Sequence, residues 1–328
     1  MGVPDIDKIF GISNEDEFRT VAMAVFRYQS TENPVYAEYI RLLGRSPGSV
    51  GSPEEIPFLP VEFFREHKVL SGNTEPEFLF ESSGTTSGNA SKHYVTDLGI
   101  YRKSFTRGFE LFYGKPEDYC ILALLPSYLG RENSSLVFMA DELIRQSGHP
   151  ESGFYLNNLD ELVNLIRDLE TSGQRSLLLG VSFALADMAE KFQLDLHHTI
   201  VMETGGMKGK RKEITREELH GLLKKGFGIQ TVHSEYGMTE LLSQAYSKGK
   251  GIFHCPPWMK VMIRDPYDPL SPVSKNNSGG INIIDLANIH SCSFIATQDI
   301  GKLTGDRGFE VIGRFDHSHI RGCNLMVE

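Results

Sequence analysis

Residues 159–181 read LDELVNLIRDLETSGQRSLLLGV, and this stretch decides the fold class. Its first part, 159–170, spaces its apolar residues as one face of an α-helix does. Its last part, 176–181, is a short apolar run without charge, which is typical of a buried strand. An amphipathic helix followed closely by a buried strand is the repeating unit of an α/β protein, so we expect a sheet of parallel strands.

The rest of the chain continues this alternation and then changes its pattern. Further buried strands are predicted at 120–126, 199–204 and 229–234, and a further amphipathic helix at 216–226. From 279 onward, the runs GGINIIDL, CSFIATQD and GFEVIGR predict short strands joined by turns. We therefore expect a helical N-terminal segment at 1–50, an α/β core at 51–278 and a small β-rich subdomain at 279–328.

The N-terminal segment carries clear helix signals. Asn14 is a good capping residue and acidic residues follow it, which predicts a helix over 13–29. A second helix is predicted to begin at Asn33-Pro34, because proline suits the first helical position, and to stop before Gly44. The Pro-, Gly- and Ser-rich stretch 46–60 is interpreted as a linker to the core.

Composition limits the possible functions. The chain has 328 residues, 40% of them hydrophobic, and a formal net charge of -10. An acidic protein is a poor partner for nucleic acid, so none is expected. The N-terminus lacks a signal peptide and no apolar stretch is long enough to span a bilayer, so a cytoplasmic protein is predicted. The four cysteines are widely spaced and form no recognisable disulfide or zinc pattern.

A loop of hydroxyls and glycines follows the apolar run PEFLF. Residues 81–92 read ESSGTTSGNASK. Glycines allow backbone amides to turn toward an anion, hydroxyls add donors, and Lys92 brings a positive charge, so the composition is that of a phosphate cradle. It does not fit the P-loop pattern GxxxxGK[ST]. A plain surface loop is the alternative.

Two more stretches have the chemistry of a nucleotide site. HSEYGMTEL (233–241) offers an aromatic ring at Tyr236, a close approach at Gly237, a hydroxyl at Thr239 and a carboxylate at Glu240. A strand-to-helix turn is the alternative interpretation. FIATQDIGKL (294–303) places Asp299 at a predicted strand end, where a carboxylate can hold a ribose diol or start a turn.

These motifs, in this order, resemble the adenylate-forming superfamily, whose members activate carboxylic acids with ATP. SSGTT, YGMTE, T-x-D at 297–299 and GRFD at 313–316 carry the resemblance, which covers roughly residues 55–328. IPFLPVEFF (56–64), LPSYLGRENSSLVFM (125–139) and ETGGMK (203–208) are similar to the acyl-protein synthetases of bacterial bioluminescence operons. The resemblance implies the layered α/β N-terminal domain of that superfamily, without its usual C-terminal domain.

The resemblance also implies roles for individual residues. The hydroxyl loop would wrap the phosphates of ATP, with Lys92 nearby, and Glu240 would bind Mg²⁺ while Thr239 touches a phosphate. Tyr236 would stack on the adenine, and Gly205 and Gly206 would lie along it. Asp299 would hold the ribose hydroxyls, with Arg314 close to the ribose or a phosphate. Two segments complete the expected nucleotide site, the loop residues Ser82, Ser83, Gly84, Thr85 and Thr86 and the glycines Gly205 and Gly206.

The sequence departs from the family pattern in two places. The loop SGTTSGNASK is longer than the usual SGTTGxPK and has no proline, which leaves the role of Lys92 open. The C-terminal domain would carry the lysine that assists adenylation, and a cation must still offset charge at the α-phosphate. Lys208 is the candidate for that role, and a surface lysine is the alternative.

A cysteine near the end of the sequence completes the hypothesis. In the bioluminescence synthetases such a cysteine is acylated, so the resemblance makes Cys323 a candidate acyl carrier, with Arg321 nearby to lower its pKa. A buried apolar role is the alternative. We expect an acid–thiol ligase that passes a fatty acyl group through Cys323 to a reductase or carrier protein. A ligase for coenzyme A or a carrier protein, and an inactive nucleotide-binding subunit, are the competing hypotheses.

Overall fold

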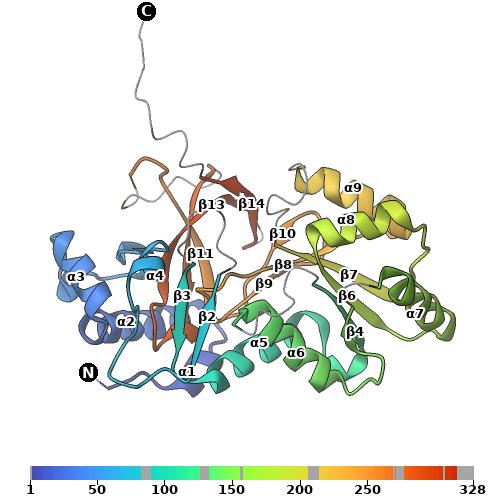
Figure 1. Ribbon diagram of the computed structural model, residues 1–328. Helices are drawn as coiled ribbons and strands as arrows, with labels where there is room; N and C mark the ends of the chain where they lie inside the picture. The colour runs from blue at the N-terminus through green and yellow to red at the C-terminus, as the bar shows by residue number, and fades with distance from the viewer. Residues whose placement is uncertain are drawn as a thin grey trace, which may run out of the picture.

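The computed structural model describes residues 2–82, 90–125, 133–155, 158–205, 214–268, 270, 277–305 and 307–315. Two sheets with their helices lie side by side, and strands β8, β9, β10 and β14 come together between them (Figure 1). The α/β class predicted from the alternating pattern is confirmed.

The first sheet has the strand order β5-β4-β6-β7-β8-β9. Strands β5, β4, β6, β7 and β8 are parallel, and β9 joins antiparallel. Their bounds are β4 Cys120–Leu124, β5 Gly153–Phe154, β6 Ser176–Val181, β7 Thr199–Thr204, β8 His233–Tyr236 and β9 Ala245–Ser247. Every residue of β4 and β6 is buried, which explains their uniformly apolar sequences.

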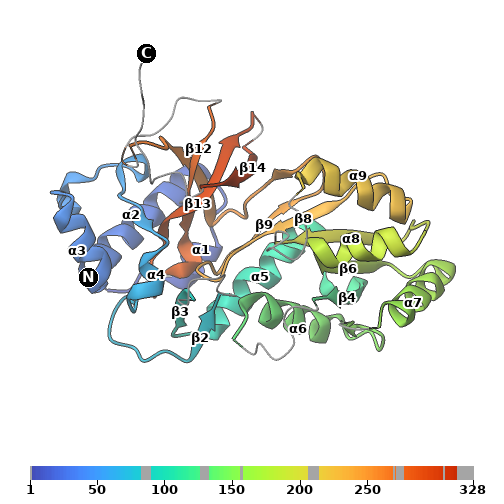
Figure 2. The same ribbon diagram turned by 45° about the horizontal axis from the view of Figure 1, so that its top comes forward.

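Helices cover both faces of this sheet. α5 (Leu98–Tyr113) and α6 (Ser135–Ser147) lie on one face, and α8 (Ser182–Lys191) and α9 (Arg216–Phe227) on the other (Figures 1 and 2). α7 (Leu159–Ser172) lies toward the outer end. The predicted helices at 159–170 and 216–226 are confirmed, and α9 begins with a capping box between Thr215 and Glu218.

The second sheet has the order β10-β14-β13-β12-β11, with β1 paired to β13. Its strands are β1 Leu59–Pro60, β10 Ile252–Phe253, β11 Met259–Arg264, β12 Gly279–Asp285, β13 Phe294–Leu303 and β14 Phe309–Arg314. Strands from 51–278 and from 279–328 thus share one sheet. The division of the chain at 50 and 278 stays a prediction.

The N-terminal helices pack against this second sheet. They are α1 Ile6–Phe10, α2 Glu15–Glu32 and α3 Pro34–Leu42, and Asn14 and Asn33 cap α2 and α3 as predicted. The buried Gln29 amide donates to the carbonyls of Asn288 and Ile289, both at 2.9 Å. The stretch 46–60, predicted as a linker, contains two 3-10 turns, Pro47–Ser49 and Pro53–Glu55, besides β1.

A two-stranded hairpin joins the parts. β2 (Phe78–Glu81) pairs antiparallel with β3 (Lys92–Val95), following the short helix α4 (Phe63–Glu66). The hydroxyl loop lies between these strands, so its two ends are brought together by the pairing of Glu81 with Lys92.

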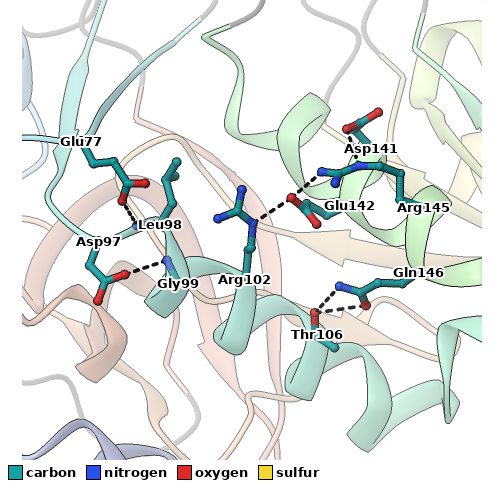
Figure 3. A network of polar contacts seen from close by, with 10 residues as sticks. All are labelled: Glu77, Asp97, Leu98, Gly99, Arg102, Thr106, Asp141, Glu142, Arg145 and Gln146. Atoms are coloured by element: carbon teal, nitrogen blue, oxygen red, sulfur yellow. Dashed lines mark hydrogen bonds and ion pairs between the residues drawn. The ribbon is translucent and has the colours of Figure 1, made fainter.

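A polar network fastens α5 to α6 (Figure 3). The buried Glu142 carboxylate accepts from Arg102 of α5 at 2.8 Å and also pairs with Arg145 of α6. One turn further along, Thr106 and Gln146 exchange hydrogen bonds. The start of α5 is fixed separately, because Asp97 and Glu77 accept from the Gly99 and Leu98 amides. The network holds the two helices in register beneath the parallel sheet.

One strand prediction was wrong in its position. The apolar run 229–234 predicts a strand there, but β8 spans His233–Tyr236 and includes the polar Ser234 and Glu235. Both side chains are buried, so burial at this position follows from the neighbouring strands and not from local hydrophobicity. Among the described helices, none combines the length and the apolar character that crossing a bilayer requires.

Candidate active site

The ends of β7 and β8 meet at the carboxyl edge of the parallel sheet, where Thr204 pairs with Glu235. Gly205 follows β7 with a φ of 65°, a left-handed conformation that favours glycine. The Ser182 hydroxyl, at the start of α8, donates to the Gly205 carbonyl at 2.5 Å. Ligands of α/β sheets bind beyond this edge, so the backbone at Gly205 is fixed where a ligand would lie.

Three of the predicted site residues form one constellation. Tyr236, the last residue of β8, donates from its hydroxyl to Asp299 Oδ2 at 2.7 Å. Arg314 Nε donates to Asp299 Oδ1 at 3.2 Å. Burial and the negative charge of Asp299 raise the pKa of Tyr236 well above its usual value, so the phenol keeps its proton. Residues far apart in the sequence are thus brought together from both sheets.

The expectation that Asp299 ends a strand was wrong. Asp299 lies inside β13 and pairs with Arg314 of β14. The pairing of β13 with β12 runs from Asn282–Ala296 to Gly280–Ile300, so extra residues of β13 bulge beside Ile281. Asp299 thus lies next to a bulge in β13, and such a bulge can redirect a side chain.

The base of the hydroxyl loop lies against the segment after β8. The Ser82 amide donates to the Ser91 carbonyl at 3.0 Å, and the Ser91 amide to the Ser82 hydroxyl at 2.8 Å. Next to them, His93 Nδ1 lies 2.8 Å from the Thr239 carbonyl. The loop therefore closes beside Thr239. Lys92 is exposed on β3.

Glu240 is the candidate metal ligand, and its side chain is buried. Burial raises the pKa of its carboxyl, while a hydrogen bond with Ser91 and the positive charge of Arg314 oppose the rise. A buried carboxylate with incomplete compensation favours a cation beside it. Mg²⁺ is commonly held by one or two carboxylates together with substrate phosphates, so Glu240 fits this role.

Several predicted residues lie outside the described part of the chain. They are Ser83, Gly84, Thr85, Thr86, Gly206, Lys208 and Cys323. Their assignments stay predictions. Among the described residues, Cys120, Cys255 and Cys292 are free thiols, in agreement with the absence of a disulfide pattern. In the same residues, no group of His, Cys, Asp or Glu has the geometry of a multi-ligand metal site.

Sequence reasoning missed Glu235, which adjoins the site. Its buried carboxyl accepts a short hydrogen bond from the Thr204 hydroxyl, across the ends of β7 and β8. Burial raises the pKa of Glu235 to about 7, and the Thr204 hydrogen bond only partly opposes this. A Cβ at Gly237 would meet Glu235 Oε1 at 2.5 Å, so any larger residue there would force this buried carboxyl to shift. The only signal in the sequence was a charged residue directly before Tyr236.

Glu203 is a second missed carboxylate, from the ETGGMK stretch. Burial would raise its pKa, yet interaction with His220 and the charge of Arg216 hold the pKa below its usual value. Arg216 Nε lies 3.3 Å from Glu203 Oε1, and its Nη1 donates to the Val311 carbonyl of β14 at 3.1 Å. Arg216 therefore ties the parallel sheet to the strand that carries Arg314.

The candidate site thus gathers a phenol, a carboxylate and a guanidinium from the two sheets. No protein-family model matches this sequence. No curated protein matches it significantly either. Solved structures do match, at probability 1.00.

Two of the matching structures show what this chain is similar to. ATP-bound MatB from Rhodopseudomonas palustris gives a TM-score of 0.55 at 14% identity, covering 72% of this chain and 47% of MatB. 2-Hydroxyisobutyryl-CoA ligase with 2-HIB-AMP and CoA gives 0.67 at 15% identity, covering 96% of this chain and 73% of the ligase. The chain thus has the fold of adenylate-forming ligases, and it spans about half the length of MatB.

Proposed function

We propose that this protein activates a carboxylic acid with ATP, forming an acyl-AMP and pyrophosphate. The constellation of Tyr236, Asp299 and Arg314 carries the proposal, because it places an aromatic ring beside a carboxylate and a cation in one site. The fold supports it, since two of the matching structures hold ATP and 2-HIB-AMP respectively. The bioluminescence acyl-protein synthetase branch is the finer assignment that we favour from the motifs, with a fatty acid as substrate.

In the first step, a carboxylate oxygen of the acid attacks the α-phosphorus of ATP, and the bond from that phosphorus to the bridging oxygen of pyrophosphate breaks. Tyr236 would stack on the adenine, with Gly205, Gly206 and Gly237 allowing close approach. Asp299 would accept from the ribose hydroxyls, and Arg314 would neutralise nearby charge.

The phosphates would lie on the hydroxyl loop between Ser82 and Ser91, with Thr239 as a further donor. Glu240 would hold Mg²⁺, which supplies charge neutralisation at the phosphates when bound. Lys208 stays the candidate for the cation at the α-phosphate, and Lys92 for a cation near the loop.

In the second step, a thiolate sulfur attacks the acyl carbonyl and AMP leaves. We propose Cys323 as that thiol, from which a reductase or carrier protein would take the acyl group. The likeness to a ligase solved with CoA favours CoA as a second candidate acceptor. A cytoplasmic location stays part of the proposal.

Acid-dependent pyrophosphate release with ATP and Mg²⁺, across fatty and aromatic acids, tests the first step. We expect release with one acid class, and its loss in Asp299→Ala. ATP binding without release for any acid would contradict the proposal and favour a nucleotide-binding subunit.

The acceptor is tested in the same assay. Cys323→Ser should keep pyrophosphate release and abolish covalent labelling of the protein by radioactive acid. Labelling that survives in Cys323→Ser would refute the cysteine, and an acyl-CoA product formed equally by this variant would establish the CoA reaction.

A further inference from the structure

The Tyr236 hydroxyl makes a contact that stacking on a base does not require. It donates to Asp299 Oδ2 at 2.7 Å, across the junction of the two sheets. We propose that this hydroxyl is a positioning group, which sets the Asp299 carboxylate to receive the two ribose hydroxyls. The inference rests on the proposed nucleotide site and assigns Tyr236 a second task, separate from that of its ring.

The two oxygens of Asp299 are held from two sides. Arg314 Nε donates to Oδ1 at 3.2 Å, while Tyr236 holds Oδ2. Each carboxylate oxygen can accept about two hydrogen bonds, so each keeps capacity for one ribose hydroxyl. With one donor on each oxygen, rotation of the carboxylate is restrained before any nucleotide binds. Nucleotide binding therefore costs less conformational entropy.

The backbone of Asp299 is fixed as well. Its amide donates to the Thr297 hydroxyl at 3.1 Å, and that hydroxyl donates to the Ile281 carbonyl of β12 at 2.9 Å. Gln298 accepts from the Phe315 amide at 2.8 Å. The bulge that carries Asp299 is therefore anchored on both sides, which leaves the side-chain torsions as its main freedom.

The Tyr236 ring is enclosed by aromatic neighbours, and its hydroxyl also interacts with Thr297. Tyr236 is only 8% exposed, and its ring meets Phe253 and Phe309 edge-on, with centroids 5.8 and 5.6 Å away. Phe309 and Arg314 belong to the same strand, β14. One strand thus holds the Tyr236 ring and the arginine of Asp299, so the hydroxyl, the carboxylate and the guanidinium keep a fixed relation.

Removing the hydroxyl alone separates the two tasks of Tyr236. Tyr236→Phe keeps the ring and its packing against Phe253 and Phe309. Tyr246→Phe is the matched control, since Tyr246 lies on the adjacent strand β9 and its buried hydroxyl has no hydrogen-bond partner among the described residues. Binding of ATP and of 2′,3′-dideoxy-ATP would be measured by calorimetry with Mg²⁺, together with thermal unfolding of each variant.

We expect Tyr236→Phe to weaken ATP binding about tenfold, because binding must then also order the Asp299 carboxylate. The affinity for dideoxy-ATP should change less than about twofold, because this nucleotide lacks both ribose hydroxyls that would donate to Asp299. In an Asp299→Asn background, Tyr236→Phe should add little further loss for ATP. Tyr246→Phe should leave the binding of both nucleotides as in the wild type.

Equal weakening for the two nucleotides, or no weakening for either, would overturn the positioning role while leaving the proposed function intact. A wild-type protein that binds ATP no better than dideoxy-ATP would overturn both the positioning role of Tyr236 and the assignment of Asp299 to the ribose. Pyrophosphate release by the wild type distinguishes a failed ribose site from a failed adenylation proposal.

Discussion

Replacing Glu235 by glutamine should make this protein more stable than the wild type as the pH rises. The burial-raised pKa of Glu235 is about 7, against an ordinary value of 4.5. Since each pKa unit corresponds to about 1.36 kcal/mol, the protonated carboxyl contributes roughly 3 kcal/mol to folding. The folded protein holds this proton more tightly than the unfolded chain. The contribution is therefore fully present below about pH 4.5 and is lost as the pH rises through about 7.

Glutamine cannot ionise, and its side-chain oxygen can still accept from Thr204. The assay is urea unfolding of wild type and Glu235→Gln at about pH 5 and about pH 8. The difference in free energy of unfolding, variant minus wild type, should rise by about 2 to 3 kcal/mol from the lower pH to the higher pH. Thr204→Val removes the hydrogen bond that lowers the pKa of Glu235. In this variant the loss of stability with rising pH should therefore occur at a higher pH than in the wild type. Parallel pH profiles for wild type and Glu235→Gln would refute the buried-carboxyl argument.

Three further predictions use the same equilibrium and kinetic assays. Gly237→Ala should destabilise the fold by about 1 to 3 kcal/mol in urea, because its Cβ would meet Glu235 Oε1 at 2.5 Å; Gly221→Ala on α9, with open space around it, should not be destabilising. Asp285→Ala should lower the free energy of unfolding by about 3 kcal/mol or more, because the buried Leu242 and Ser243 amides lose their acceptor. The control Asp141→Ala, at an exposed position, should lower it by less than about 1 kcal/mol, and an equally small loss for Asp285→Ala would contradict this reasoning. Glu240→Gln should lower Mg²⁺-dependent pyrophosphate release about 100-fold in steady-state assays while the protein stays folded, and unchanged release would remove Glu240 from the metal site.

Much of the parallel sheet follows from local pattern. The runs at 120–126, 176–181 and 199–204 are uncharged or nearly so, and each proves to be a buried strand. Burial between two helical layers imposes such composition, so the sequence carries the signal directly. β8 was placed too early in the chain because Glu235 looks like a loop residue. Its burial depends on β7 and β9, which local hydrophobicity does not report.

The candidate site was only partly accessible from sequence. Tyr236, Asp299 and Glu240 stood out because they adjoin predicted strands, and Arg314 was named through the family resemblance. Glu235 did not stand out, since its raised pKa comes from burial. The bulge in β13 beside Asp299 could not be predicted either, because an irregular register is a property of two paired strands.

By itself, the sequence determined the α/β class and the capped N-terminal helices, because periodicity and capping act within a few residues. Only the tertiary structure decided that Tyr236 donates to Asp299, 63 positions away in the chain, and that Arg216 connects Glu203 to β14. Such contacts depend on how two sheets dock, and docking is set by the packing of the whole core, which no short stretch of sequence encodes.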